Sequence, residues 1–232
     1  MDSVDTNESM FIRILQAIDS AGALQDIVLI GSWVLPVYRS RFGNSPEIPI
    51  LRTTDVDFLV ARQPPIKTKA DIPSILEQLG FETIRSPQGG YSKYIHAEME
   101  VDFLTPEYGR GTNKAIPIDA LGVYAQPLRY VSLAIDHSDV MPYRGLDVRV
   151  PKPGAFLLLK LLVISRRRDS DKARKDRETV RELGAFLIER TEQKEEIVCL
   201  FTSLPVGWQN TILLSSEKLL PELARIVRQQ RF

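Results

Sequence analysis

The stretch that decides the fold spans residues 53–60 and reads Thr53-Thr54-Asp55-Val56-Asp57-Phe58-Leu59-Val60. Its second half is apolar, so we expect a β-strand over residues 56–60. Side chains alternate between the two faces of a strand, so Asp55 and Asp57 share one face while Val56 points into the core. The stretch therefore predicts two carboxylates side by side at the start of a buried strand.

A third carboxylate lies in another strand candidate, residues 100–104, where Asp102 stands between apolar neighbours. On a strand next to the first, Asp102 would complete a group of three with Asp55 and Asp57. Two carboxylates about 4 Å apart repel by several kcal/mol at an effective dielectric constant near 20, so the group needs a cation. Carboxylate oxygens suit Mg²⁺, which keeps part of its coordination shell for substrate phosphate. We expect a site for Mg²⁺ (or Mn²⁺) here.

The dipeptide Gly31-Ser32 separates an apolar strand candidate, residues 27–30, from a helical segment, residues 33–39. Glycine lets the backbone approach a phosphate closely, while the serine hydroxyl and the helix N-terminal N–H groups donate to its oxygens. Each piece alone is common, and Asp-x-Asp alone is more often a solvated strand edge. The order of strand, Gly-Ser, helix, Asp-x-Asp and third aspartate favours a functional site.

These pieces together resemble the nucleotidyltransferase superfamily of DNA polymerase β type. The residues that carry the resemblance are Leu29-Ile30-Gly31-Ser32-Trp33, Arg52-Thr53-Thr54-Asp55-Val56-Asp57-Phe58-Leu59 and Glu100-Val101-Asp102-Phe103-Leu104. The resemblance covers the first half of the chain and implies that Asp55 and Asp57 hold the metal ions. It also implies that Asp102 completes the site and activates the acceptor, and that Gly31 and Ser32 grip the triphosphate.

A subgroup of bacterial nucleotidyltransferase-fold proteins is similar in two further features, an insertion around residues 43–49 and the lead-in from Arg52. The resemblance therefore adds Arg52 to the nucleotide-binding candidates. Lys160, inside an apolar helical run, is similar to a lysine of abortive-infection and toxin nucleotidyltransferases that reaches the triphosphate. Its own context leaves two readings open: a core-edge lysine with its ammonium in solvent, or a phosphate ligand.

The predicted fold class is α/β (α+β), with a nucleotidyltransferase-type mixed β-sheet flanked by helices and a helical C-terminal part. We expect a helix that opens after Ser9 and one over residues 71–80, further strands over residues 81–85, 91–96, 129–135 and 147–150, and a long polar loop over residues 105–117. Beyond residue 153 the patterns are only helical. We therefore predict a nucleotidyltransferase core of residues 1–150 and a helical domain of residues 151–232.

Composition limits the other expectations. Thirty basic residues balance thirty acidic ones, so any nucleic-acid surface must be local. The basic segment 166–177 is such a candidate, although a solvated helix pair with internal ion pairs is slightly favoured. The lone Cys199 excludes an internal disulfide and is expected to be buried. Residues 1–9 lack a signal-peptide pattern, and the apolar run 155–164 is too short to span a bilayer, so we expect a cytoplasmic protein without a membrane partner.

The predicted reaction transfers a nucleoside monophosphate from a nucleoside triphosphate to an acceptor hydroxyl, with release of pyrophosphate. The acceptor class stays open between an RNA 3′ end (such as that of tRNA), a protein and a small molecule. We expect a further partner, either an antitoxin or a second copy of the chain in a homo-oligomer. Two alternatives remain: a non-catalytic nucleotide- or RNA-binding module on the same fold, and a phosphohydrolase that uses the same carboxylates, which the absence of clustered histidines disfavours.

Overall fold

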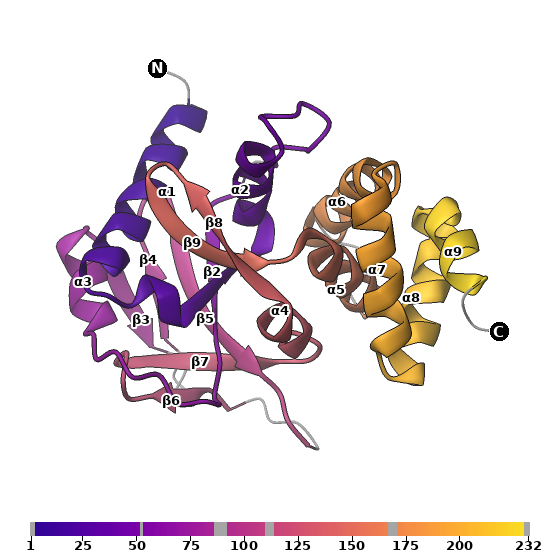
Figure 1. Cartoon of the computed structure of the whole chain (residues 1–232). Coiled ribbons are helices and arrows are strands. Elements are labelled where there is room, and N and C mark those ends of the chain that lie inside the picture. Colours follow the sequence, from indigo (N-terminus) through magenta and orange to yellow (C-terminus); the bar gives the residue numbers. More distant parts are fainter. Residues whose placement is uncertain (1–2, 52, 86–91, 110–113, 167–170, 230–232) are drawn as a thin grey trace. The chain divides into compact units, whose positions relative to one another are not determined.

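The computed structural model describes residues 3–51, 53–85, 92–109, 114–166 and 171–229 (Figure 1). The chain divides into two compact units. The first comprises Met1–Val37 and Arg52–Pro151, and the second comprises Tyr38–Leu51 and Lys152–Phe232. The segment of residues 38–51 therefore groups with the C-terminal helices, which no sequence feature indicated. The predicted division into residues 1–150 and 151–232 stays a prediction.

The first unit contains a mixed β-sheet (Figure 1). Its strands are β1 (Ile27–Ile30), β2 (Asp55–Val60), β3 (Glu82–Arg85), β4 (Ser92–Ile95), β5 (Glu100–Pro106), β6 (Ile116–Ile118) and β7 (Val123–Leu128). The order is β1-β2-β5-β4-β3, and β7 pairs with both β5 and β6. The β2–β5 and β5–β7 pairs are parallel and the others antiparallel. A separate hairpin consists of β8 (Ser138–Tyr143) and β9 (Leu146–Pro151).

Helices complete both units. In the first unit they are α1 (Ser3–Ser20), α3 (Ile72–Gln78) and α4 (Ser132–Asp136), with short 3-10 turns at Leu24–Asp26 and Gly31–Trp33. Helix α2 (Val34–Arg41) begins in the first unit and ends in the second. The second unit also contains α5 (Pro153–Ile164), α6 (Asp171–Ile188), α7 (Thr191–Ser203), α8 (Val206–Leu219) and α9 (Pro221–Arg228). The predicted fold class, a mixed sheet with helices and a helical C-terminal part, is confirmed.

Aromatic rings form the apolar face of the sheet. The Phe58 ring on β2 stacks on the Phe103 ring on β5 with the centroids 5.7 Å apart, and Tyr94 on β4 meets Phe103 edge-on at 5.9 Å. All three side chains are fully buried. Because side chains alternate along a strand, this packing turns the neighbouring residues of β2 and β5 to the opposite face.

The second unit is built around α5, which contacts α6, α7 and α8 and is buried along most of its length. The segment of residues 38–51 is anchored on these helices. Tyr38 meets Phe156 of α5 edge-on with the ring centroids 5.9 Å apart, and Phe42 meets Phe186 of α6 in the same way at 5.1 Å. Tyr38 and Phe156 are both nearly inaccessible to solvent, so this contact is part of the unit's core.

Most predicted elements are confirmed where the structure describes them, including the helix over residues 71–80. There the Asp71 carboxylate accepts a hydrogen bond from the Ser74 backbone N–H at 3.2 Å, as expected of a capping residue. The opening helix is longer than predicted, since α1 begins at Ser3. The turn expected between the strands at residues 81–85 and 91–96 lies outside the described residues.

Two predicted elements are wrong. Residues 129–135 are not a strand, because β7 ends at Leu128 and Tyr130 takes a left-handed φ of 69°, after which α4 begins. The polar loop over residues 105–117 is shorter than predicted at both ends. Its first part continues β5, because the buried Thr105 hydroxyl donates to the Val60 carbonyl at 3.0 Å and so satisfies its polar atom inside the sheet.

Cys199 is exposed, so the expectation of a buried cysteine is wrong. On α7 the residues at helical spacing, Ile197, Leu200 and Phe201, are buried, and Cys199 lies off that face. In the part of the chain that the structure describes, no helix has the length and apolar character needed to cross a bilayer.

Glu8 connects α1 to the β8–β9 hairpin. The Tyr143 hydroxyl donates to Glu8 Oε1 at 3.0 Å, and Arg144 Nη2 donates to the same oxygen at 2.7 Å. Burial, followed by the charge of Glu8, raises the pKa of Tyr143 to about 12, so its hydroxyl remains a donor at neutral pH.

We predict that Glu8→Ala lowers the free energy of unfolding by about 1–2 kcal/mol, because it leaves the buried Tyr143 hydroxyl without its acceptor. Urea unfolding measures the change. In a Tyr143→Phe background the same substitution should cost clearly less, since both partners are then gone. Equal costs in the two backgrounds would contradict the assignment.

Candidate active site

The three predicted aspartates lie on one face of two adjacent parallel strands. In the β2–β5 ladder Asp57 is directly opposite Asp102, and Asp55 is directly opposite Glu100. Paired residues of neighbouring strands point to the same face and lie roughly 5 Å apart. The sheet therefore brings together all three predicted carboxylates and adds a fourth, that of Glu100.

Local hydrogen bonds hold the start of β2 in place. The Asp55 backbone N–H donates to the Thr53 hydroxyl at 3.2 Å, and the Glu100 N–H donates to the Thr54 carbonyl at 2.8 Å. The ladder between β2 and β5 thus extends into the residues that precede Asp55. The two carboxylates at the strand starts are attached to ordered backbone rather than to a loose end.

Gly31 is required where it stands for two reasons. Its φ of 77° lies in the left-handed region, which side chains disfavour. A Cβ atom at this position would also lie 2.5 Å from Asp57 Oδ2, closer than non-bonded atoms approach. The 3-10 turn Gly31–Trp33 therefore passes against the Asp57 carboxylate, with Ser32 half-buried in it. The predicted phosphate turn and the predicted metal ligand are neighbours.

Lys93 lies beside these carboxylates. The sequence did not identify it as a charged partner of the aspartates. Lys93 on β4 forms an ion pair with Glu100, and its Nζ lies 3.7 Å from Asp102 Oδ2. Burial of the ammonium opposes its charge, but the hydrogen bond to Glu100 and the charges of Asp102, Glu100 and Asp55 outweigh it. The pKa of Lys93 is therefore raised above its usual value, and the side chain is charged at neutral pH.

The signal for Lys93 was present in the alternation of β4. Tyr94 is buried against Phe103, as expected for a strand aromatic, so its neighbour Lys93 must point to the other face of the sheet. Finding its partner required knowing that β4 pairs with β5. The Trp33 ring packs in the core, where it stacks on the Phe11 ring with the centroids 4.1 Å apart.

The donor set suits a hard divalent cation. Asp55, Asp57, Glu100 and Asp102 offer only carboxylate oxygens, all on one face, and these are the ligands that Mg²⁺ and Mn²⁺ prefer. Among the described residues, no group of three or more His, Cys, Asp or Glu side chains is arranged so that it could hold a metal ion. The ammonium of Lys93 neutralises part of this acidic face instead. The residues fit a divalent cation by their chemistry and their shared face.

Two further nucleotide-binding residues were predicted, Arg52 and Lys160. Arg52 is outside the described residues, and so is the part of the basic segment 166–177 that covers residues 167–170. Lys160 belongs to the second unit, on α5. Its Nζ donates to Asp176 Oδ1 of α6 at 2.6 Å and lies 5.0 Å from the Phe156 ring centroid. With 12% of its side chain exposed, Lys160 is not a lysine with its ammonium in solvent.

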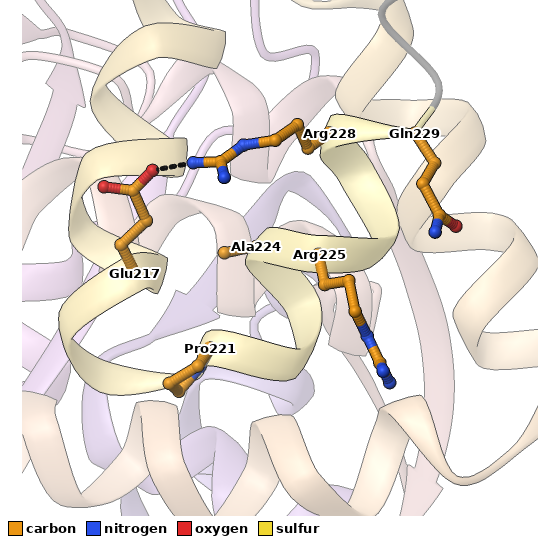
Figure 2. Close-up of a pocket in the computed structure, with 6 residues that line it drawn as sticks. All are labelled: Glu217, Pro221, Ala224, Arg225, Arg228 and Gln229. Carbon is orange, nitrogen blue, oxygen red and sulfur yellow. Dashed lines mark hydrogen bonds and ion pairs between the residues drawn. The ribbon is translucent and has the colours of Figure 1, made fainter.

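A pocket of about 640 Å³ lies between α8 and α9 in the second unit (Figure 2). Figure 2 shows Arg228 and Glu217 joined by an ion pair beside the small side chains of Pro221 and Ala224. None of the predicted site residues lines this pocket.

Comparison with known proteins supports one family. A family model described as nucleotidyltransferase matches residues 9–197, which is more than half of the chain. The matched region includes Gly31, Ser32 and the three aspartates. None of the curated proteins matches this chain.

Among solved structures, an antigenic nucleotidyltransferase-like protein from Paracoccidioides brasiliensis is 15% identical, with a TM-score of 0.47, over 94% of this chain and 91% of its own. The antibiotic-resistance factor ANT(2″)-Ia is 13% identical, with a TM-score of 0.44, over 99% of this chain and 92% of its own. A second structure of ANT(2″)-Ia, in complex with adenylyl-2″-tobramycin, is 14% identical, with a TM-score of 0.41, over 97% and 96%. The family assignment rests on the family match and not on these likenesses.

We predict that Gly31→Ala lowers the free energy of unfolding by about 2 kcal/mol, through backbone strain and through the contact with Asp57. Gly145→Ala is the matched control, because Gly145 has a φ of 80° and nothing within 4 Å of its added Cβ. That variant should lose only about 1 kcal/mol, the cost of strain alone. Chemical unfolding of both variants measures the difference. Equal losses would show that the Asp57 carboxylate does not constrain position 31.

We also predict that Lys160→Met lowers the free energy of unfolding by about 3 kcal/mol, because it removes the Lys160 ammonium from the buried carboxylate of Asp176. The exposed Lys218 on α8 is the control, and Lys218→Met should change stability by less than about 0.5 kcal/mol. Urea unfolding separates the two outcomes. A loss at Lys160 as small as that at Lys218 would refute a structural role for the ion pair.

Proposed function

This chain belongs to the nucleotidyltransferase family, and we propose that its reaction transfers a nucleoside monophosphate from a nucleoside triphosphate to an acceptor hydroxyl with release of pyrophosphate. The observation that carries this proposal is the register of β2 and β5, which sets Asp57 beside Asp102 and next to the Gly31 turn. A carboxylate group next to a glycine turn suits a substrate that carries both phosphate and a divalent cation.

In this proposal Asp55, Asp57 and Asp102 hold Mg²⁺ or Mn²⁺. When bound, the cation neutralises the triphosphate and lowers the pKa of the acceptor hydroxyl. In this proposal Asp102 also acts as the general base. It lies opposite Asp57, and 13% of its side chain is exposed, so an acceptor can reach it. From there it orients the acceptor hydroxyl toward the α-phosphorus and accepts its proton as the new bond forms and pyrophosphate leaves.

The Gly31–Trp33 turn supplies the phosphate contacts in this scheme. Its backbone N–H groups and the Ser32 hydroxyl donate to the β- and γ-phosphate oxygens, and the absence of a side chain at Gly31 allows the close approach. Arg52 and Lys160 complete the proposed nucleotide contacts. Lys160 would have to share its ammonium between Asp176 and a phosphate, which a side chain with three N–H donors can do.

The acceptor is proposed as a class only: an RNA 3′ end, such as that of tRNA, a protein hydroxyl or a small molecule. The first turns of α6 carry Lys172, Arg174, Lys175 and Arg177, and the first two of these side chains are exposed. Arg174 forms an ion pair with Asp171 of the same helix, which fits a solvated helix, while exposed basic residues on one helix also suit the phosphate backbone of a nucleic acid, so RNA is one of the acceptors to test. The cytoplasmic location, an antitoxin partner and a homo-oligomer stay predictions.

The test is incubation of the pure protein with each α-labelled nucleoside triphosphate and Mg²⁺, together with cellular RNA, with the protein alone, or with a small-molecule extract. Label that appears in one acceptor pool only when Mg²⁺ is present supports transfer and identifies the acceptor class. Release of labelled nucleotide with no labelled acceptor would indicate a phosphohydrolase. Magnesium-dependent triphosphate binding with neither product would indicate a non-catalytic binding module.

We predict that Asp57→Asn and Asp102→Asn each lower the rate of labelled transfer by at least about a thousandfold, because each removes a charged ligand of the cation. Asp139→Asn, which changes an exposed aspartate on β8, should keep the rate within about twofold. Retained transfer in either of the first two variants would place the reaction elsewhere on the protein.

A further inference from the structure

The side chain of Lys93 forms ion pairs with carboxylates on the acidic face of the sheet. Its ammonium lies between Glu100 and Asp102, and the charge of Asp55 also acts on it. These three carboxylates come from two different strands, β2 and β5. The ammonium therefore lies at the β4 side of the residues proposed to hold the divalent cation, where it pairs with one of them, Asp102.

Lys93 has an apolar neighbour on one side and carboxylates on the other. About 29% of its side chain is exposed, Ile84 of β3 lies directly opposite it, and its two charged partners, Glu100 and Asp102, both lie on β5. A monovalent ammonium and a divalent cation that share the same oxygens repel each other strongly at this distance. Either Lys93 moves away when the cation binds, or additional negative charge must arrive with the cation.

We propose that Lys93 is an internal competitor of the divalent cation, which makes tight cation binding depend on the triphosphate. This inference rests on the proposed function. Without nucleotide, the ammonium neutralises Asp102 and Glu100 and keeps the affinity for the cation low. The triphosphate brings several negative charges, so the ammonium and the divalent cation then bind together.

Glu100 explains how both cations fit. It is the nearer partner of Lys93, whereas Asp102 Oδ2 lies 3.7 Å from the ammonium. Lys93 can therefore keep its hydrogen bond to Glu100 while Asp102 turns toward the cation. Glu100 in this view holds the competing ammonium and is not itself required as a ligand.

The experiment titrates Mn²⁺ into the pure protein and measures free Mn²⁺ by electron paramagnetic resonance, with and without a non-hydrolysable triphosphate analogue. Without the analogue, Lys93→Met should bind Mn²⁺ at least about tenfold more tightly than the unaltered protein. With the analogue, the difference should shrink to within about threefold. Lys93→Arg keeps the charge, and Lys69→Met removes an exposed lysine elsewhere in the first unit, so both should bind like the unaltered protein. Equal or weaker binding by Lys93→Met would overturn the inference.

Two further variants separate this inference from the proposed function. Adding Asp57→Asn or Asp102→Asn to Lys93→Met should abolish Mn²⁺ binding. If binding persists, the cation lies elsewhere, and the proposed metal site fails with the inference. If these aspartates are needed but Lys93→Met changes nothing, only the role of Lys93 is wrong. Circular dichroism confirms that each variant is folded, and Lys93→Gln replaces Lys93→Met should the latter not fold.

Discussion

The parallel pairing of β2 with β5 is the contact on which the rest of the first unit depends. Its register places Asp57 opposite Asp102 on one face and stacks Phe58 on Phe103 on the other. Because side chains alternate with a period of two, a slip of one residue in either strand would turn its carboxylates into the core and its phenylalanine out. The burial of the aromatic face therefore determines the geometry of the acidic face.

Alternation along single strands was enough to predict the carboxylate group, because Asp55 and Asp57 share a face in any strand and Asp102 lies among buried neighbours. It could not predict that Lys93 contacts Asp102, because that contact depends on the pairing of β4 with β5. The same signal was misleading at residues 129–135. Apolar residues at alternate positions there fit a strand, yet the left-handed φ of Tyr130 ends β7 and opens α4.

Contacts between residues far apart in the sequence are a second feature that the sequence alone could not predict. The sequence shows an insertion around residues 43–49, and nothing local shows what the segment of residues 38–51 packs against. In the structure Phe42 meets Phe186, and Glu47 pairs with Arg190, 143 residues further along the chain. The chain thus leaves the first unit just after the Gly31 turn and re-enters it just before Asp55. Both elements of the candidate site are covalently joined to a segment that is held by the helices.

The acidic face affects both the stability of the fold and the affinity for the divalent cation, in opposite directions. Several carboxylates on one face repel each other, and that repulsion lowers the stability of the fold until a cation offsets it. A divalent cation can do this only when it is bound, whereas Lys93 offsets part of the repulsion at all times. A lysine in this place stabilises the protein without its cation and, by the same attraction, weakens the first binding of the cation. Stability of the empty site and affinity for the cation are therefore opposed, and a substrate that brings its own negative charge removes the conflict.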